Sequence, residues 1–179
     1  MTDWFSVAIW SLVGTWVLVV GTLLLMYWQT RTSQKLNSAN AVMALRERFD
    51  GPHMRGARRA LAADLLEGKR EDLSSVEVVT FFELVGTLTH HEALEAELVW
   101  EAFGTWVGAY YVGIRHPVDR VERIRTDLGD PLIFHEFEWL YRRMLTLDVR
   151  HGPRAQPTPE AEATTAQRIL ALEAALPPV

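Results

Sequence analysis

The chain has 179 residues, six histidines, no cysteine and a formal net charge of −5, which suits one modest domain with attachments. The absence of cysteine excludes disulfide bonds, thiolate catalysis, iron–sulfur clusters and cysteine-based zinc sites. Acidic side chains dominate after residue 59, where 20 acidic and 11 basic groups give −9, a balance unfavourable for binding nucleic acid.

The first predicted element is an apolar segment without any charged side chain, residues 4–28, WFSVAIWSLVGTWVLVVGTLLLMYW. As a helix it would be about 37 Å long, which exceeds the hydrocarbon core of a bilayer, about 30 Å. We therefore predict a transmembrane anchor over residues 1–30, with Trp4, Tyr27 and Trp28 at the membrane interfaces. Because Asp3 precedes the segment and no A-x-A site follows it, the anchor is expected to persist rather than be cleaved.

Charge on either side of this segment predicts its orientation. Residues 29–59 carry seven basic and two acidic side chains, hence +5, whereas Asp3 is the only charged side chain before the span. The positive-inside rule then places the N-terminus outside and the remaining domain in the cytoplasm, at a bacterial inner membrane. The basic residues predicted to contact anionic lipid headgroups or an acidic partner are Arg46, Arg48, Arg55, Arg58 and Arg59. Pairing with acidic groups of the chain's own bundle is the alternative, and both can hold together.

One face of the predicted span carries small residues, which let a second membrane helix approach closely. These residues are Ala8, Gly14, Thr15, Gly21 and Thr22. Ordinary use of Gly and Thr in membrane helices is the alternative explanation. The span contains no histidine and no charge, so it offers neither the usual haem ligand nor an ion pathway.

A helical stalk is predicted for residues 31–49 and a cytoplasmic helical bundle for residues 50–149. Asp50-Gly51-Pro52 breaks the stalk and starts a helix over about residues 52–67, because proline suits a first helical turn. Ser74-x-x-Glu77 is a capping-box pattern that predicts the next helix, residues 75–88.

Two longer helices follow in the predicted bundle. The first covers about residues 92–115, and the second begins at Asp130-Pro131 and covers residues 132–147, with a charged segment between them. The last 30 residues, 150–179, are predicted to be a proline-containing linker and an amphipathic helix. The predicted fold class is all-α, with one N-terminal transmembrane helix and a small cytoplasmic helical bundle.

The sequence THHE at residues 89–92 has two interpretations. Thr89 and Glu92 have the spacing of a capping box, which would make this segment a corner between two helices. A metal site would instead need Glu83, His91 and Glu95 to converge. The Glu-x-x-His and His-x-x-x-His patterns of helical metal sites do not occur, so helix capping is favoured and neither a metal nor another cofactor is predicted.

A series of aromatic residues between positions 100 and 111 predicts a buried helix face, from which Trp100 and Tyr111 deviate. These two side chains are candidate contacts for a partner. The short apolar side of the C-terminal helix adds three more, Ile169, Leu172 and Leu176. That helix is too short to be stable alone, so it must dock on the bundle, dock on a partner or fray.

Several motifs resemble a bacterial family of domains of unknown function. They are RFD at residues 48–50, Met54 with Ala57-Arg58, Leu61-Ala62, FFELVG at residues 81–86, and the series Trp100, Phe103-Gly104, Trp106 and Tyr110-Tyr111. The resemblance covers residues 46–143 and leaves the C-terminal tail out. It implies an N-terminal span with a small helical cytoplasmic domain, and it implies no activity.

These features favour a non-catalytic, membrane-anchored interaction protein. We expect an accessory or assembly subunit of a larger inner-membrane complex, for which an energy-transducing complex is one candidate. The integral-membrane partner would be contacted by both the transmembrane helix and the cytoplasmic domain. The alternative is a membrane-tethered ligand sensor or metal-dependent enzyme with a pocket near Glu83, His90, His91 and His135. Self-association through the small-residue face is a third hypothesis.

Overall fold

The structure, a computed structural model, describes residues 22, 26, 28, 29, 35–68, 76–116, 119–151 and 159–177. The chain divides into two compact units, residues 1–38 and 39–179, and the second unit is the helical domain considered below. Among the described residues, no helix combines the length and apolar character needed to cross a bilayer. Most of the predicted span, including Trp4, Ala8, Gly14, Thr15, Gly21 and Tyr27, lies outside the described residues.

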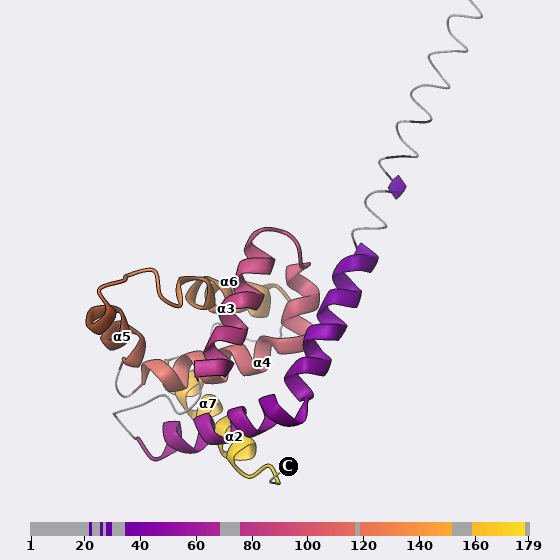
Figure 1. The fold of residues 1–179 in the computed structure, drawn as a ribbon. Helices are drawn as coiled ribbons and strands as arrows, with labels where there is room; N and C mark the ends of the chain where they lie inside the picture. Colours follow the sequence, from indigo (N-terminus) through magenta and orange to yellow (C-terminus); the bar gives the residue numbers. More distant parts are fainter. Residues whose placement is uncertain are drawn as a thin grey trace, which may run out of the picture. The chain divides into compact units, whose positions relative to one another are not determined.

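Every regular element in the described part of the chain is a helix, which confirms the predicted all-α bundle. Residues 35–50 are helical and lead into the helices of the domain (Figure 1). These helices are α2 (Pro52–Leu66), α3 (Val76–His90), α4 (Ala96–Arg115), α5 (Arg120–Leu128), α6 (His135–His151) and α7 (Pro159–Ala174).

Local sequence signals explain where two of these helices begin and end. Pro52 occupies the first turn of α2 after an extended Gly51, as predicted, because proline has no N–H that the helix would need there. The charged segment after residue 118 was not predicted as a helix, yet it forms α5. Asp119 accepts a hydrogen bond from the backbone N–H of Glu122, and Gly129 ends α5 with a left-handed φ of 65°.

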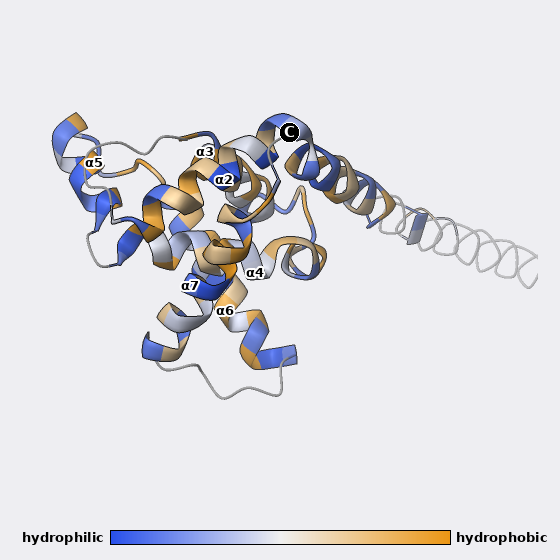
Figure 2. Ribbon diagram, turned by 90° about the horizontal axis from the view of Figure 1, so that it is seen from below, coloured by the Kyte–Doolittle hydropathy of each residue, from blue (hydrophilic) through white to orange (hydrophobic). Residues whose placement is uncertain are grey.

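The core of the domain lies between α3, α4 and α6, and aromatic rings fill its centre. Phe82 of α3 stacks on Phe137 of α6 with ring centroids 5.3 Å apart, and the fully buried Phe103 of α4 lies 5.7 Å from Phe81 of α3. Each such side chain contributes about 1.5–3 kcal/mol through burial. Hydrophobic and hydrophilic residues share the same helices in Figure 2, as expected for amphipathic helices around one core.

Helices α3 and α6 approach each other closely at a glycine. A Cβ atom added to Gly86 would lie 2.8 Å from the carbonyl carbon of Glu136, closer than real Cβ atoms approach backbone. The absence of a side chain at Gly86 therefore sets the distance between these helices. It also brings the end of α3 next to the beginning of α6, where several charged residues meet.

The helix before α2 contributes to this core, whereas residues 31–49 were predicted as a separate stalk. Phe49 is fully buried, and its ring lies 5.2 Å from that of Phe81 and 5.6 Å from that of Phe103. Val42 is also buried. The helical domain thus begins near Ala39, about ten residues earlier than the predicted boundary at residue 50.

The predicted Thr89–Glu92 cap is wrong. Helix α3 continues to His90, and the hydroxyl of Thr89 donates to the carbonyl of Val85 within α3. Glu92 has a left-handed φ of 58°, and the N–H groups of Ala93 and Leu94 donate to the carbonyl of Leu88. This arrangement ends a helix, so the segment closes α3 instead of starting α4, which begins at Ala96.

The predicted start of α6 at Asp130-Pro131 is also wrong. The carboxylate of Asp130 accepts from the N–H of Leu132, two residues on, which forms a turn. Helix α6 begins only at His135. Asp130-Pro131 therefore marks the turn before the helix, not the first residues of the helix.

The C-terminal helix α7 docks on the domain, against α2 and α4. Its buried residues are Ala166, Leu170 and Glu173, which share one helix face. Leu172, one of the predicted partner contacts, is 72% exposed and does not face the domain. Because Glu173 is buried beside apolar residues, α7 is positioned by charge as well as by apolar contact.

Candidate functional site

The three residues of the alternative metal site, Glu83, His91 and Glu95, have separate places in the structure. The carboxylate of Glu83 accepts from the backbone N–H groups of Glu136 and Phe137, at 3.2 and 2.7 Å, and so caps the start of α6. Glu95 is the N-cap residue of α4, and His91 is exposed. Within the described ranges, no group of three or more metal-ligating side chains could hold an ion.

His90, rather than His91, makes the contacts at this corner. Its Nδ1 lies 2.8 Å from a carboxylate oxygen of Glu136, and its ring stacks on Trp139 with centroids 4.4 Å apart. His91 stacks on the outer side of His90 at 5.6 Å. The corner therefore joins α3 to α6 through one histidine, and Glu83 and His90 act on the same turn of α6.

Burial raises the pKa of Glu83, and the hydrogen bonds from Phe137 and Glu136 offset only part of that rise. A carboxyl with a raised pKa in a cleft is a common candidate for acid–base catalysis. Here both carboxylate oxygens already accept backbone hydrogen bonds. The structural role of a helix cap accounts for this side chain.

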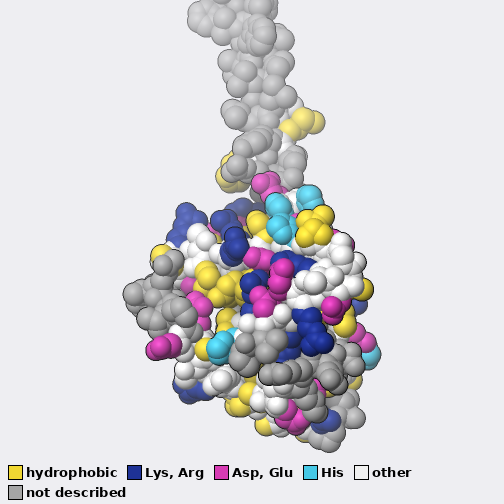
Figure 3. Space-filling view, turned by 90° about the vertical axis from the view of Figure 1, so that its left-hand side faces the viewer, with side chains coloured by type: hydrophobic (Ala, Val, Ile, Leu, Met, Phe, Trp, Pro, Cys, Tyr) yellow, Lys and Arg dark blue, Asp and Glu magenta, His cyan; other side chains and the backbone are white. Residues whose placement is uncertain are grey.

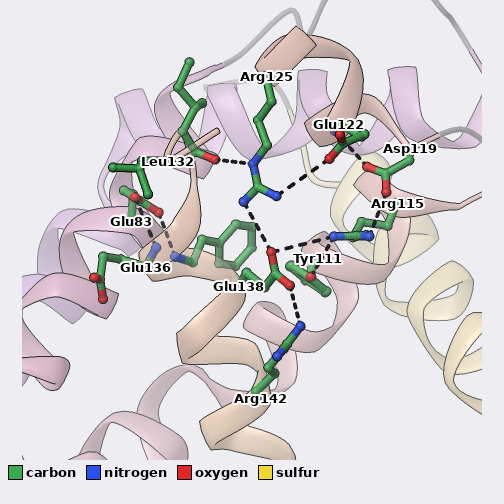
Figure 4. A network of polar contacts seen from close by, with 12 residues as sticks. Glu83, Tyr111, Arg115, Asp119, Glu122, Arg125, Leu132, Glu136, Glu138 and Arg142 are labelled. Atoms are coloured by element: carbon green, nitrogen blue, oxygen red, sulfur yellow. Dashed lines mark hydrogen bonds and ion pairs between the residues drawn. The ribbon is translucent and has the colours of Figure 1, made fainter. Parts of the chain in front are cut away.

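A second polar network surrounds Glu138 of α6 (Figure 4). Its carboxylate lies 3.2 Å from a guanidinium nitrogen of Arg125 in α5 and 2.7 Å from one of Arg142 in α6. Arg115 of α4 approaches to 3.8 Å and also pairs with Asp119 at 2.8 Å. One carboxylate thus joins three helices, and it holds the otherwise hydrophilic α5 against the bundle.

The ionised form of Glu138 is favoured by these neighbours. Burial opposes ionisation, but the hydrogen bond from Arg125 and the charges of Arg142, Arg125 and Arg115 together hold its pKa below the ordinary value of 4.5. Arg125 also donates to the carbonyl of Ile133, so it fixes the turn before α6. We interpret the network as a structural tie between helices.

Glu138→Gln is expected to flatten the acid side of the stability curve of the protein. Because the folded-state pKa of Glu138 is lowered, its contribution is present above the unfolded value and is lost as the pH falls through the folded value. Unfolding monitored by circular dichroism between about pH 6 and 3 should show the parent losing more stability than the variant.

The matched control for this experiment is Glu122→Gln, because Glu122 is 66% exposed and lies 3.9 Å from Arg125. Its curve should remain parallel to that of the parent. Glu83, whose raised pKa has the opposite sign of effect, is unchanged in both variants and cancels in the comparison. Parallel curves for the parent and Glu138→Gln would contradict the prediction.

A third set of charged groups is buried where α7 meets α2. Arg58 is 4% exposed, its Nε lies 3.2 Å from a carboxylate oxygen of Glu173, and its guanidinium covers the ring of Phe49 at 4.1 Å. The indole N–H of Trp106 donates to the other oxygen of Glu173 at 2.8 Å. The hydroxyl of Tyr110 donates to Glu173 more weakly, at 3.4 Å.

Two of the arginines predicted to contact lipid or an acidic partner are engaged inside the domain. Arg58 is buried as described, and Arg46 pairs with Asp50 at 2.7 Å and lies over the ring of Trp106. Arg58 is buried and cannot reach a headgroup, so for this residue the headgroup prediction is wrong and the alternative, pairing with an acidic group of the bundle, is confirmed. Arg55 donates to the carbonyl of Asp50, while Arg48 is exposed and Arg59 is half-buried.

A groove with a volume of about 450 Å³ lies along α4, between α6 and α7. Trp100 and Tyr141 stand on its walls. The indole N–H of Trp100 donates to Asp148 at 2.7 Å, and the hydroxyl of Tyr141 donates to Glu162 at 3.0 Å. Burial and the hydrogen bond to Glu162 raise the pKa of the Tyr141 hydroxyl, so it remains protonated and a donor.

The groove brings together two of the five predicted partner contacts, Trp100 and Ile169. Leu172, on the same helix as Ile169, is exposed, and Leu176, just after that helix, is half-buried. Tyr111 is only 8% exposed and stacks on Tyr141 with centroids 4.2 Å apart, so its assignment as a partner contact is wrong. Two other predicted residues, Thr22 and Trp28, are described in the first unit, where both are helical and exposed.

Charged side chains of both signs are interspersed on the face of the protein drawn in Figure 3, where basic and acidic groups lie next to one another. This pattern agrees with the pairing of arginines and glutamates around α5. Sequence reasoning missed Glu136 and Glu173 as key carboxylates. The spacing Asp119-x-x-Glu122 was the one local signal that could have revealed α5, the helix on which Arg125 lies.

A family model described as a domain of unknown function, DUF4760, matches residues 6–144. No match was found among curated proteins or among solved structures. Because the matched region covers most of the chain, the protein belongs to this family, as the resemblance had indicated. The match begins at residue 6, so it includes nearly all of the apolar N-terminal segment. It ends at residue 144, within α6 and before the linker to α7.

Proposed function

We propose that this DUF4760 protein is a non-catalytic, single-pass membrane protein that packs against a larger inner-membrane complex as an accessory or assembly subunit. The observation that carries the proposal is that the carboxylates which the fold brings together are used in contacts between helices. Glu83, Glu138 and Glu173 each connect one helix to another. Such a domain offers surfaces for binding, and these three carboxylates are already used to hold its own helices together.

The membrane part of the proposal rests on the apolar segment at residues 4–28, which the family match includes almost entirely. Positive charge after this segment favours an outside N-terminus and a cytoplasmic helical domain. The small residues of the segment would contact a membrane helix of the partner. An energy-transducing complex of a bacterial inner membrane remains one candidate partner.

Extraction of the native membranes with mild detergent tests this function. The full chain should co-purify with integral-membrane proteins in a constant ratio, which mass spectrometry and native gel electrophoresis measure. A monomer without any associated protein would count against the proposal. A particle that contains only copies of this chain would replace it with self-association, which crosslinking in the membrane would confirm.

A further inference from the structure

The groove along α4 lies between two helices that both pack on α4, and it is long enough for a further short helix. Helices α6 and α7 each pack against α4, whereas within the described ranges their backbones do not contact each other. The groove extends beside α4 from Trp100 to Val112. These thirteen residues of helix, with twelve rises between them, correspond to about 18 Å, or somewhat more than three turns, which is the length of contact that a short partner helix makes.

The floor of this groove is built from small side chains of α4. Gly104 and Gly108 lie one turn apart, with Thr105 and Ala109 beside them. A Cβ atom added to Gly108 would meet no other atom within 4 Å, so the space above it is open. A glycine that no side chain covers lets the backbone of another helix approach closely, and Gly108 meets this condition, whereas the indole of Trp100 lies 3.1 Å from where a Cβ of Gly104 would be. No neighbour inside the described domain requires a glycine at position 108.

The charge of the groove is negative. Its carboxylates are Glu101 of α4, Asp148 of α6 and Glu162 of α7, and none of the described residues that line it is Lys, Arg or His. Asp148 and Glu162 each accept one hydrogen bond, from Trp100 and Tyr141. Across the described residues, none of the three carboxylates forms an ion pair, in contrast to Glu138 with its arginines.

We propose that the groove binds a short helical segment of a partner protein that carries lysine or arginine on its docking face. The cationic groups would meet Glu101, Asp148 and Glu162, while the backbone of the segment lies over Gly108. Charge complementarity selects this occupant, because three carboxylates that form no ion pair with any described residue attract a basic helix and repel an acidic one. The inference rests on the proposed function and assigns the surface through which the helical domain would act.

Photocrosslinking in the producing cells tests the site with the full chain. A benzophenone amino acid is placed at Thr105, which is exposed and lines the groove, and separately at Gly56 on α2 as a control. Irradiation should crosslink position 105, and not position 56, to a co-purifying protein. Mass spectrometry of the crosslinked peptide should identify a segment rich in lysine or arginine.

A steric block gives the second arm of the experiment. Gly108→Phe places a ring in the groove from a position where an added Cβ meets nothing within 4 Å, and Gly56→Phe is its matched control because a Cβ there also has open space. Both variants should keep the parent's helical circular dichroism. Gly108→Phe should lower the yield of the crosslinked partner at least tenfold, and Gly56→Phe should leave it unchanged.

The outcomes separate the two proposals. If a partner co-purifies but crosslinks elsewhere, or survives Gly108→Phe, the groove is not its docking site and only this inference fails. A crosslinked segment that is neutral or acidic, or that belongs to a second copy of this chain, also overturns it. If no protein co-purifies with the parent, the proposed function itself fails.

Discussion

Glu173→Ala is expected to lower the free energy of unfolding of the helical domain by about 3–5 kcal/mol. The substitution leaves the guanidinium of Arg58 buried without its nearest carboxylate, which lies 3.2 Å from its Nε. Nε and Nη1 of Arg58 make no hydrogen bond within the described residues, so nearby negative charge is their main compensation. Asp50 is the other carboxylate near this group, at 3.7 Å.

The loss should be concentrated in α7. Trp106 and Tyr110 also lose the acceptor that connects them to this helix. Hydrogen exchange followed by mass spectrometry should therefore show faster exchange across α7 than across α3, in addition to a lower midpoint of chemical unfolding. Unchanged protection of α7 would show that its apolar contacts alone position it.

Two further variants identify the cause of this loss. Glu160→Ala removes an exposed carboxylate from the same helix and should cost no more than about 1 kcal/mol. Glu173→Leu combined with Arg58→Met replaces the buried pair by apolar side chains and should be more stable than Glu173→Ala. A double variant as unstable as the single one would assign the loss to packing or to the indole hydrogen bond.

Phe49→Ala is expected to lower the free energy of unfolding by about 3–5 kcal/mol as well. The ring is fully buried, and it contacts the rings of Phe81, Phe82, Phe103 and Trp106 at centroid distances of 5.2–5.6 Å. Its removal leaves a cavity among side chains from two other helices. Unfolding of the full chain in mild detergent, followed by near-ultraviolet circular dichroism, measures the change.

The matched control is Met43→Ala, because Met43 belongs to the same helical segment and is 70% exposed. It should change the stability by roughly 0.5 kcal/mol or less. Equal, small effects at both positions would mean that residues 39–50 are a stalk outside the cooperative core. Since the ring of Phe49 also lies beneath Arg58, the effects of Phe49→Ala and Glu173→Ala should not be additive.

The helical architecture was largely predictable from local patterns. The apolar spacing that predicted a helix over residues 92–115 matches α4 within a few residues, and Pro52 begins α2 as expected. The predicted helix boundaries were wrong where one residue pattern can occur both at the start and at the end of a helix. Thr89-x-x-Glu92 has the spacing of a cap, yet Glu92 adopts the left-handed conformation that ends α3, and Leu94 after it is buried in the core.

The candidate site was less predictable for a physical reason. Periodicity relates residues three or four positions apart, so it can suggest the pair Glu138–Arg142 but not Arg115 and Arg125 on neighbouring helices. The groove has the same origin. Trp100, Tyr141 and Ile169 are distant in sequence and meet only because α6 and α7 pack on opposite sides of one face of α4.

By itself the sequence determined that the domain is all-α, that Pro52 begins a helix and that cysteine chemistry is excluded, because composition and helical periodicity are local properties. Tertiary structure alone decided which charges are used internally. Ion pairing depends on a separation of a few ångströms in space, and Arg58 and Glu173 reach it across more than a hundred residues of chain. It also decided that Glu101, Asp148 and Glu162 surround one groove, since packing of α6 and α7 on α4 places them there.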